Sequence, residues 1–413
     1  MATDPDKFLA LRMQAGQVFT PGAPVDEKDL FAGRIEQFDK VLQAATQRGY
    51  HAVLYGERGV GKTSLANILA GALRNSPGWV APRVNCDGGD TYSTLWRKAL
   101  QDIVMTTTKQ APGFVVAETT SRESILDALP ADLSPDDVRR ALTQLSGGAH
   151  LLIAFDEFDR LSDKQVTVLM SDTIKTLSDY AIDATVLLIG VADSVDDLVA
   201  GHQSVERALV QIPMPRMSAQ EIEEIVINGL NRLGMEIEAA ALSELVALSQ
   251  GLPYITHLLG LNSVRSALEG TRLKVTAADV DKGIRSSLDQ WQQTVIRAYY
   301  DATQSSQPGN IYKQVLLACA LADTDDLGFF QASAVREPLR VITSREYDIP
   351  NFAQHLKNFS EEGRGGMLQR TGETRRIRYR FTSPLMRPYI VMKGFADGLI
   401  TRKQMQKIRG DQV

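Results

Sequence analysis

A lysine and a threonine that follow a run of glycines give this sequence its most specific chemistry. Residues 56–64 read GERGVGKTS, and the glycines allow the backbone to curl so that successive N–H groups converge on bound phosphates. Lys62 adds a positive charge for the β- and γ-phosphates, and Thr63 adds a hydroxyl that can ligate a phosphate-bound Mg²⁺. The predicted nucleotide contacts of this loop are Gly56, Glu57, Arg58, Gly59, Val60, Gly61, Lys62, Thr63 and Ser64. We therefore expect ATP and Mg²⁺ as cofactors.

Two carboxylates form the second chemical feature. The stretch LLIAFDEFDRL, residues 151–161, is a buried-strand pattern that runs into Asp156 and Glu157. Acidic residues that end a strand are often part of a solvated turn. After a phosphate loop, however, they are typical of a site in which Asp156 holds Mg²⁺ through its water shell and Glu157 polarises the attacking water.

The elements around these motifs alternate between strands and helices. An apolar run, AVLY, precedes the glycine loop, and a helix pattern follows it. Further strands are predicted near 80–87 and 184–194, with helices that begin at Ser93 as N-cap and at Ser134 followed by Pro135. This order predicts an α/β fold with a parallel, three-layer sheet.

Composition adds weaker constraints. The chain has 413 residues, 44% hydrophobic and 23% charged, which predicts more than one domain and no membrane partner. No apolar run reaches the roughly 18 residues of a membrane span, and the first residues do not resemble a secretion signal. Cys86 and Cys319 are expected to be reduced, buried thiols of a cytoplasmic protein. Residues 311–413 carry 17 Lys and Arg against 11 Asp and Glu, net +6, whereas the rest is net −11.

Together, GERGVGKTS, LLIAFDEFDRL, LLIGVADS and an arginine near VERALVQIPMPRMS resemble the AAA+ ATPases, most closely the origin-recognition and replication-initiator clade. The resemblance implies that Asp193 is the sensor 1 residue, although the family usually has asparagine there and Ser194 is the alternative. It implies that Arg207 reaches a neighbouring subunit as an arginine finger, with Arg216 as second candidate. On pattern alone, Arg207 could instead be a surface residue paired with Glu206 or a neighbouring carboxylate.

Two further segments enter through the same resemblance. Phe31 and Arg34 precede a helix pattern and resemble the family's contact with the nucleotide base, although Phe31 could instead be a core residue. After Pro215 only helices are predicted, the first with Ser218 and Glu221 in capping-box spacing, which matches the family's helical lid. The lid lacks the usual sensor 2 arginine and reads Gly251-Leu252-Pro253, which is similar to STAND signalling ATPases, where the proline meets the nucleotide. His257 could substitute, but a histidine on an apolar helix is more often a core residue.

The C-terminal region predicts three helices and a basic hairpin, the pattern of a winged helix. The linker SSQPGN, residues 305–310, marks the boundary before it. The third predicted helix is closed by Gly363. It would present Asn351, Gln354, His355, Lys357 and Asn358 to DNA bases. The hairpin contributes Arg370, Arg375, Arg376, Arg378 and Arg380 for contacts with phosphates. The alternative is a charged edge strand or a winged helix that docks a protein.

The sequence thus predicts an ATPase core over 1–215, with 1–30 left open, a lid over 216–304 and a winged helix over 311–413. The predicted function is a slowly hydrolysing, oligomeric ATP switch that binds double-stranded DNA. The alternative is a STAND-like signalling or scaffold ATPase whose winged helix docks a protein partner. The residues do not distinguish replication initiation, transposition, plasmid maintenance and phage defence.

Overall fold

The computed structural model describes residues 5–23, 33–101, 103, 105–110, 118–123, 125–192, 195, 198–199, 203–325, 327–372 and 377–410. Contacts divide the chain into two compact units. The helical unit comprises Met1–Ala23, Arg58–Val60 and Arg216–Val413, and the sheet unit comprises Pro24–Glu57 and Gly61–Pro215. In the described ranges, no helix is long and apolar enough to cross a membrane.

The sheet unit is built on parallel strands, as the sequence predicts. Within the described residues the sheet has six strands in the order β2-β6-β7-β1-β8, and β3 pairs with β6 beside β2. Every pairing in it is parallel. The strands are β1 (His51–Gly56), β2 (Trp79–Val80), β3 (Arg83–Asn85), β6 (His150–Asp156), β7 (Ala184–Val191) and β8 (Leu209–Pro213).

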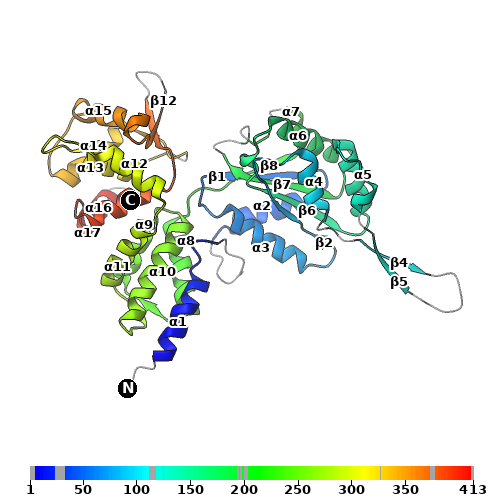
Figure 1. Ribbon diagram of the computed structural model, residues 1–413, viewed down its shortest axis with the longest axis horizontal. Helices are drawn as coiled ribbons and strands as arrows, with labels where there is room; N and C mark the ends of the chain where they lie inside the picture. Colours follow the sequence, from blue (N-terminus) through cyan, green and yellow to red (C-terminus); the bar gives the residue numbers. More distant parts are fainter. Residues whose placement is uncertain are drawn as a thin grey trace. The chain divides into compact units, whose positions relative to one another are not determined.

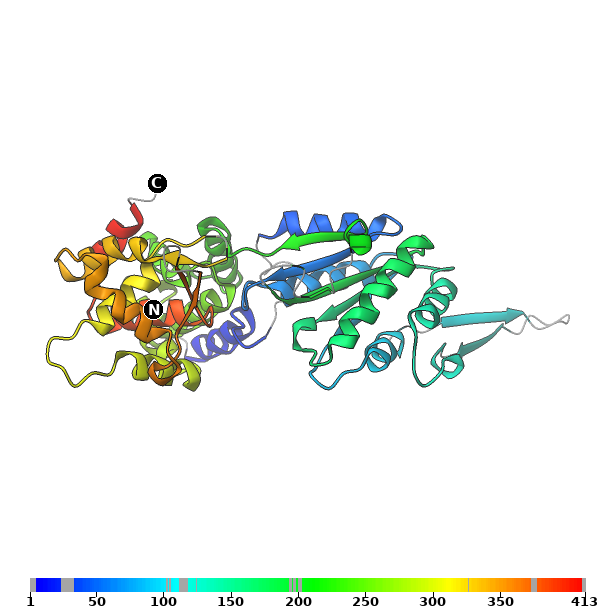
Figure 2. The same cartoon turned by 90° about the horizontal axis from the view of Figure 1, so that it is seen from above.

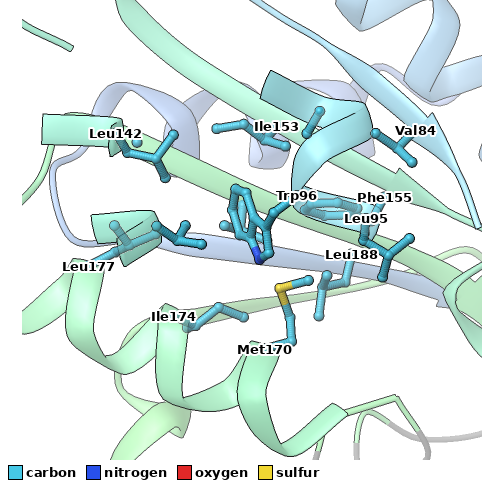
Figure 3. Packing of buried hydrophobic residues seen from close by; sticks show 14 of the residues in the cluster. Val84, Leu95, Trp96, Leu142, Ile153, Phe155, Met170, Ile174, Leu177 and Leu188 are labelled. Carbon is cyan, nitrogen blue, oxygen red and sulfur yellow. The ribbon is translucent and has the colours of Figure 1, made fainter. Parts of the chain in front are cut away.

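Helices cover both faces of this sheet and complete three layers (Figures 1 and 2). One face packs against α2 (Ile35–Thr46) and α3 (Lys62–Arg74). The other is covered by α4 (Tyr92–Gln101), α5 (Pro135–Leu145) and α6 (Lys164–Asp179), and a short α7 (Gln203–Glu206) precedes β8. Figure 3 shows the core under α4, where the Trp96 ring meets the Phe155 ring at 5.1 Å in an edge contact. Alternate residues of β6, such as Ile153 and Phe155, face this core, which fixes the direction in which the strand ends.

A hairpin that no sequence pattern indicated lies between α4 and α5. Strands β4 (Met105–Gln110) and β5 (Glu118–Glu123) pair antiparallel from Met105 opposite Glu123 to Gln110 opposite Glu118. The hairpin forms a separate two-stranded sheet and projects away from the parallel sheet (Figures 1 and 2). It is an insertion into the α/β order and not one of its layers.

The helical unit is centred on α10 (Pro253–Glu269), which packs against α1 (Pro5–Val18), α8 (Ala219–Arg232), α9 (Ala239–Ser249) and α11 (Ala277–Asp289). Two short strands, β9 (Glu236–Ile237) and β10 (Lys274–Val275), pair beside these helices, and α12 (Gln293–Thr303) follows. The buried Phe19 ring, just after α1, lies against Gly229 and Gly260, where a Cβ would come within 2.5 and 2.8 Å of it. The N-terminal segment therefore belongs to the lid helices.

The C-terminal region forms the predicted winged helix. Its helices are α13 (Tyr312–Leu321), α14 (Ala332–Thr343) and α15 (Ile349–Phe359), and its sheet is ordered β11 (Phe330–Gln331), β13 (Arg378–Phe381), β12 (Leu368–Thr371). Two further helices that the sequence did not indicate follow, α16 (Met386–Ala396) and α17 (Arg402–Gly410). Because α16 packs on α9, α11 and α12, residues on both sides of the 305–310 linker belong to one compact unit. The other expected boundary, after Pro215, coincides with a boundary between the units.

Two local expectations were wrong. Ser93 does not cap α4, because the helix begins at Tyr92 and the Ser93 hydroxyl accepts a hydrogen bond from the Leu133 N–H at 2.9 Å. Gly363 does not close α15, which ends at Phe359 before a separate turn at Glu362–Arg364. The caps at Ser134 and Ser218 are confirmed, each with a reciprocal capping box. Both cysteines are buried and free of disulfides, as expected.

Candidate functional site

Three glycines shape the loop between β1 and α3. Gly56, Gly59 and Gly61 have φ angles of 151°, 86° and 98°, a region that side chains strongly disfavour. At Gly56 there is also no room, because a Cβ would lie 2.4 Å from the backbone oxygen of Met214. The loop therefore depends on glycine both for its turn and for its close packing against the chain after β8.

Lys62 begins α3 and folds back over this loop. Its side chain is buried, and Nζ donates to the backbone oxygens of Gly56 at 2.9 Å and Glu57 at 2.8 Å. Gly61 provides no side-chain cap, and Thr63 lies in the first turn of the helix. The first N–H groups of a helix have no partner within it, so this end of α3 can bind an anion.

Asp156 ends β6 as a buried carboxylate. Its Oδ1 accepts a hydrogen bond from the Glu157 N–H at 2.8 Å. Its Oδ2 lies 3.1 Å from a guanidinium nitrogen of Arg83, yet within the described residues this oxygen makes no hydrogen bond of good geometry. The Glu157 side chain is about half exposed, and its Oε2 accepts from Arg160 at 2.6 Å.

These oxygens fit a Mg²⁺ ion that arrives with a nucleotide. In the ranges that the structure describes, no group of three or more His, Cys, Asp and Glu side chains could hold a metal ion alone. Mg²⁺ in nucleotide sites takes one or two protein oxygens together with phosphate oxygens and water. Asp156 offers a buried oxygen without a hydrogen bond, and Thr63 offers a half-buried hydroxyl.

Asp159 is a residue of this region that the sequence analysis missed. Its Oδ1 accepts from the Val191 N–H at 2.7 Å, and a Cβ on Gly190 would lie 3.0 Å from the same oxygen. Asp159 thus ties the end of β7 to the turn after β6. The second aspartate of DEFD could have indicated it. The predicted sensor residue Asp193 and its alternative Ser194, which follow β7, lie outside the described residues.

Arg83 is the second missed residue. It lies on β3, and its guanidinium contacts three acceptors: Asp156, Asn85 at 2.7 Å and Asn67. Its only sequence signal was a charged residue between Pro82 and Val84 in a stretch predicted to be a strand.

The predicted arginines of the sheet unit differ in exposure. Arg34 is buried at the start of α2 and donates to the backbone oxygen of Pro215, while Phe31 lies outside the described residues. Arg207 is exposed between α7 and β8, and it forms no ion pair or hydrogen bond with any described side chain, Glu206 included.

The glycine-leucine-proline segment lies at the start of α10. Gly251 has φ 72°, and a Cβ there would lie 2.7 Å from the backbone oxygen of Met217. Pro253 occupies the first turn of α10, and Arg216 donates to the backbone oxygen of Gln250 at 3.2 Å. Pro253 thus begins its helix from a tightly packed turn.

His257 behaves as a core residue. Its Nδ1 accepts from the Thr20 N–H at 3.2 Å, and burial lowers its pKa to about 4. It is neutral near pH 7 and satisfied inside the helical unit, which agrees with the core interpretation.

The wing arginines divide into two groups. The guanidinium groups of Arg378 and Arg380 lie 4.9 and 4.6 Å from the centroid of the Phe329 ring. Arg378 also pairs with Asp325 at 3.0 Å. Arg370 is exposed and has no ion-pair partner among the described residues. Arg375 and Arg376 lie outside the described residues.

Helix α15 presents fewer side chains to solvent than predicted. Asn358 donates to the Tyr312 hydroxyl at 2.8 Å, and the His355 ring lies against the Tyr312 ring. The Asn351 side chain is exposed, but its oxygen accepts from the Asp348 N–H in a capping box. Gln354 and Lys357 are exposed, and Lys357 makes no ion pair with the described residues.

The chain is similar in sequence and fold to known ATPases. Residues 30–189 match the model of the AAA ATPase domain. The structure is similar to a Walker-type ATPase of Pyrococcus abyssi at 16% identity and TM-score 0.54, over 90% of this chain and 99% of that one. The structure is also similar to the ORC2 protein of Aeropyrum pernix, at 15% identity and TM-score 0.48, over 96% of this chain and 98% of that one. It is similar to the ORC1 protein of Aeropyrum pernix in complex with DNA at 15% identity and TM-score 0.46, over 93% of this chain and 97% of that one. No curated protein matches the sequence.

Proposed function

We propose that this chain, which has a P-loop AAA+ fold and matches the AAA ATPase domain over residues 30–189, is an ATP-hydrolysing switch that binds double-stranded DNA as an ATP-dependent oligomer. One observation carries the ATPase part. Asp156 is a buried carboxylate whose Oδ2 accepts no hydrogen bond from the described residues, and its strand runs parallel to the one that leads into the phosphate loop. The carboxyl ends of such strands open on one crevice, where ligands of α/β folds bind.

Each residue then has a chemical role. The helix start at Lys62 and the lysine itself offset phosphate charge, and Thr63 with Asp156 would hold the Mg²⁺. When bound, the ion supplies positive charge against the phosphate oxygens. Glu157 accepts a proton from the attacking water, and its Oε2, which accepts from Arg160, becomes available for this when that pair opens. An exposed ion pair of this kind contributes little to stability because solvent screens its charges, so nucleotide binding can break it.

Substitution of Glu157 tests this assignment. Glu157→Gln should keep ATP bound within about threefold of wild-type affinity and lower the hydrolysis rate at least about 100-fold, because only the proton acceptor is lost. Asp163→Asn, which changes the capping carboxylate of α6, is the matched control. Hydrolysis by Glu157→Gln at the wild-type rate would refute the role of Glu157.

The oligomeric part of the proposal rests on Arg207. An exposed arginine without a described partner, ahead of β8, can contribute its charge to the nucleotide of a neighbouring subunit. The specific ATPase rate should therefore rise with protein concentration in the wild type and stay flat in Arg207→Ala. A wild-type rate independent of concentration would remove the role of Arg207 in a neighbouring subunit.

The DNA-binding part rests on charge. The region 311–413 has a net charge of +6 against −11 in the remainder, and Lys357 and Arg370 are exposed on the winged helix. Basic side chains without internal partners can neutralise DNA phosphates.

A second candidate function has its own support. Arg378 and Arg380 engage Phe329, and the turn before Pro253 matches the STAND-like pattern. Both observations favour a signalling ATPase whose winged helix docks a protein. Absence of duplex binding at low salt would favour this candidate.

A further inference from the structure

Arg83 places a positive charge beside the oxygen that we assign to the metal. A guanidinium nitrogen of Arg83 lies 3.1 Å from Asp156 Oδ2, and the Asp156 side chain is only 3% exposed. The opposite oxygen, Oδ1, accepts from the Glu157 N–H. Arg83 is therefore the charged partner of the carboxylate oxygen that has no hydrogen bond.

The other contacts of Arg83 hold it at this position. Its guanidinium also donates to Asn67, on the helix that begins at Lys62, and to Asn85, which pairs in register with Asp156. Asn67 is four residues after Thr63, so it lies one helical turn further along the same face of α3. Arg83 thus links the helix that carries Thr63 to the strand that carries Asp156.

A guanidinium and a Mg²⁺ ion compete for one carboxylate oxygen. Like charges a few ångströms apart in a partly buried site repel strongly, so the approach of the ion to Asp156 is favoured when Arg83 moves away. Room for that movement exists. Arg83, Asn67, Asn85, Arg74 and Trp79 line a cavity of about 590 Å³ beside the edge strands.

We propose that Arg83 is a positioning residue that holds Asp156 before nucleotide binds and is displaced into this cavity when Mg²⁺ binds with it. This inference rests on the nucleotide site proposed above. In this proposal Arg83 sets the Mg²⁺ concentration that nucleotide binding requires. It does so without contacting ATP.

The test measures binding and not turnover. A fluorescent ATP analogue is titrated with wild type and Arg83→Gln, first in EDTA and then over a series of Mg²⁺ concentrations. In EDTA we expect the two affinities to agree within about twofold. Mg²⁺ should increase the affinity for the analogue in both proteins. The Mg²⁺ concentration that gives half of this increase should be about threefold to tenfold lower in Arg83→Gln, because the competing charge is gone.

Two variants separate charge from packing. Arg83→Lys keeps the charge and should keep a Mg²⁺ requirement within about twofold of wild type. Arg74→Gln removes an exposed arginine that lines the same cavity and donates to the Ala70 backbone oxygen, and it should change nothing. A melting temperature for each variant establishes that it is folded.

The outcomes are distinct. An unchanged or higher Mg²⁺ requirement in Arg83→Gln would overturn the displacement, as would an equal fall in Arg83→Lys or Arg74→Gln. Failure of the proposed function would instead appear in the wild type, as absence of nucleotide binding at any Mg²⁺ concentration.

Discussion

The phosphate loop and the wing, the two regions predicted to bind negative charge, differ in what their cations do. At the phosphate loop, Lys62 donates to two backbone oxygens of its own loop, next to a helix start that provides further donors. In the wing, Arg378 is already paired with Asp325 and stacked on Phe329, and Arg380 shares that ring. The phosphate loop thus places a cation beside backbone N–H groups that can bind an anion. In the wing, part of the positive charge is used for contacts within the protein.

The difference teaches that spacing in the sequence is a better guide to a site than charge. The glycine positions before Lys62 dictate a backbone that has few uses other than binding phosphate. A cluster of arginines dictates nothing comparable, because guanidinium groups also stack on rings and pair with nearby carboxylates. The predictions below test this contrast.

The largest effect is expected at the phosphate loop. Lys62→Ala should weaken binding of a fluorescent ATP analogue at least about 100-fold, because a buried ammonium group over the loop is lost. Lys40→Ala, in an exposed pair with Glu36 on α2, should leave that affinity within about twofold. Similar losses in the two variants would mean that Lys62 acts only through general charge, and the contrast between the regions would be lost.

A smaller effect concerns how the wing region is held. Arg402 of α17 donates to Glu244 of α9 at 3.0 Å and to Asp281 of α11 at 2.5 Å, and the Glu244 side chain is only 5% exposed. Arg402→Ala would leave Glu244 buried without this partner, so the free energy of unfolding measured by urea denaturation should fall by about 2 kcal/mol. This loss is smaller than for a fully buried ion pair, because Arg402 is half exposed. Arg297→Ala, from an exposed pair within α12, should cost less than about 0.5 kcal/mol. Equal stability of the two variants would indicate that α17 does not anchor the winged helix to the lid.

The smallest effect separates the wing cations. Lys357→Ala with Arg370→Ala should weaken duplex DNA binding about tenfold at low salt and lower the salt slope by about two, because two phosphate contacts are lost. Arg378→Ala should change DNA affinity less than about twofold, since its charge is already engaged. Lys282→Ala on α11 is the control for loss of one surface charge. A larger effect of Arg378→Ala than of the double variant would reverse the division of the wing.

The sequence predicted the alternating strands and helices and the helical regions after them. It did not predict the elements and residues whose positions depend on contacts between distant parts of the chain. The parallel sheet, the helical lid and the three winged-helix helices followed from local signals such as Ser134, Ser218 and the apolar run at 151–155. Helices α1, α16 and α17 were missed, and their places depend on partners far along the chain, as with Phe19 against Gly229 and Gly260. Within the site, the glycine loop and Asp156 were predictable from spacing. Arg83 was not, because its role depends on strand register between β3 and β6.

Duplex DNA affinity measured in ATP, in ADP and without nucleotide, each at two salt concentrations, tests the central claim most directly. The proposed switch predicts tight binding only with ATP, and affinity that falls steeply with salt because phosphate contacts release counterions. Lys62→Ala should bind DNA equally in all three nucleotide conditions. Wild-type protein that fails to bind duplex at low salt, or that binds equally well in all three conditions, would contradict the account.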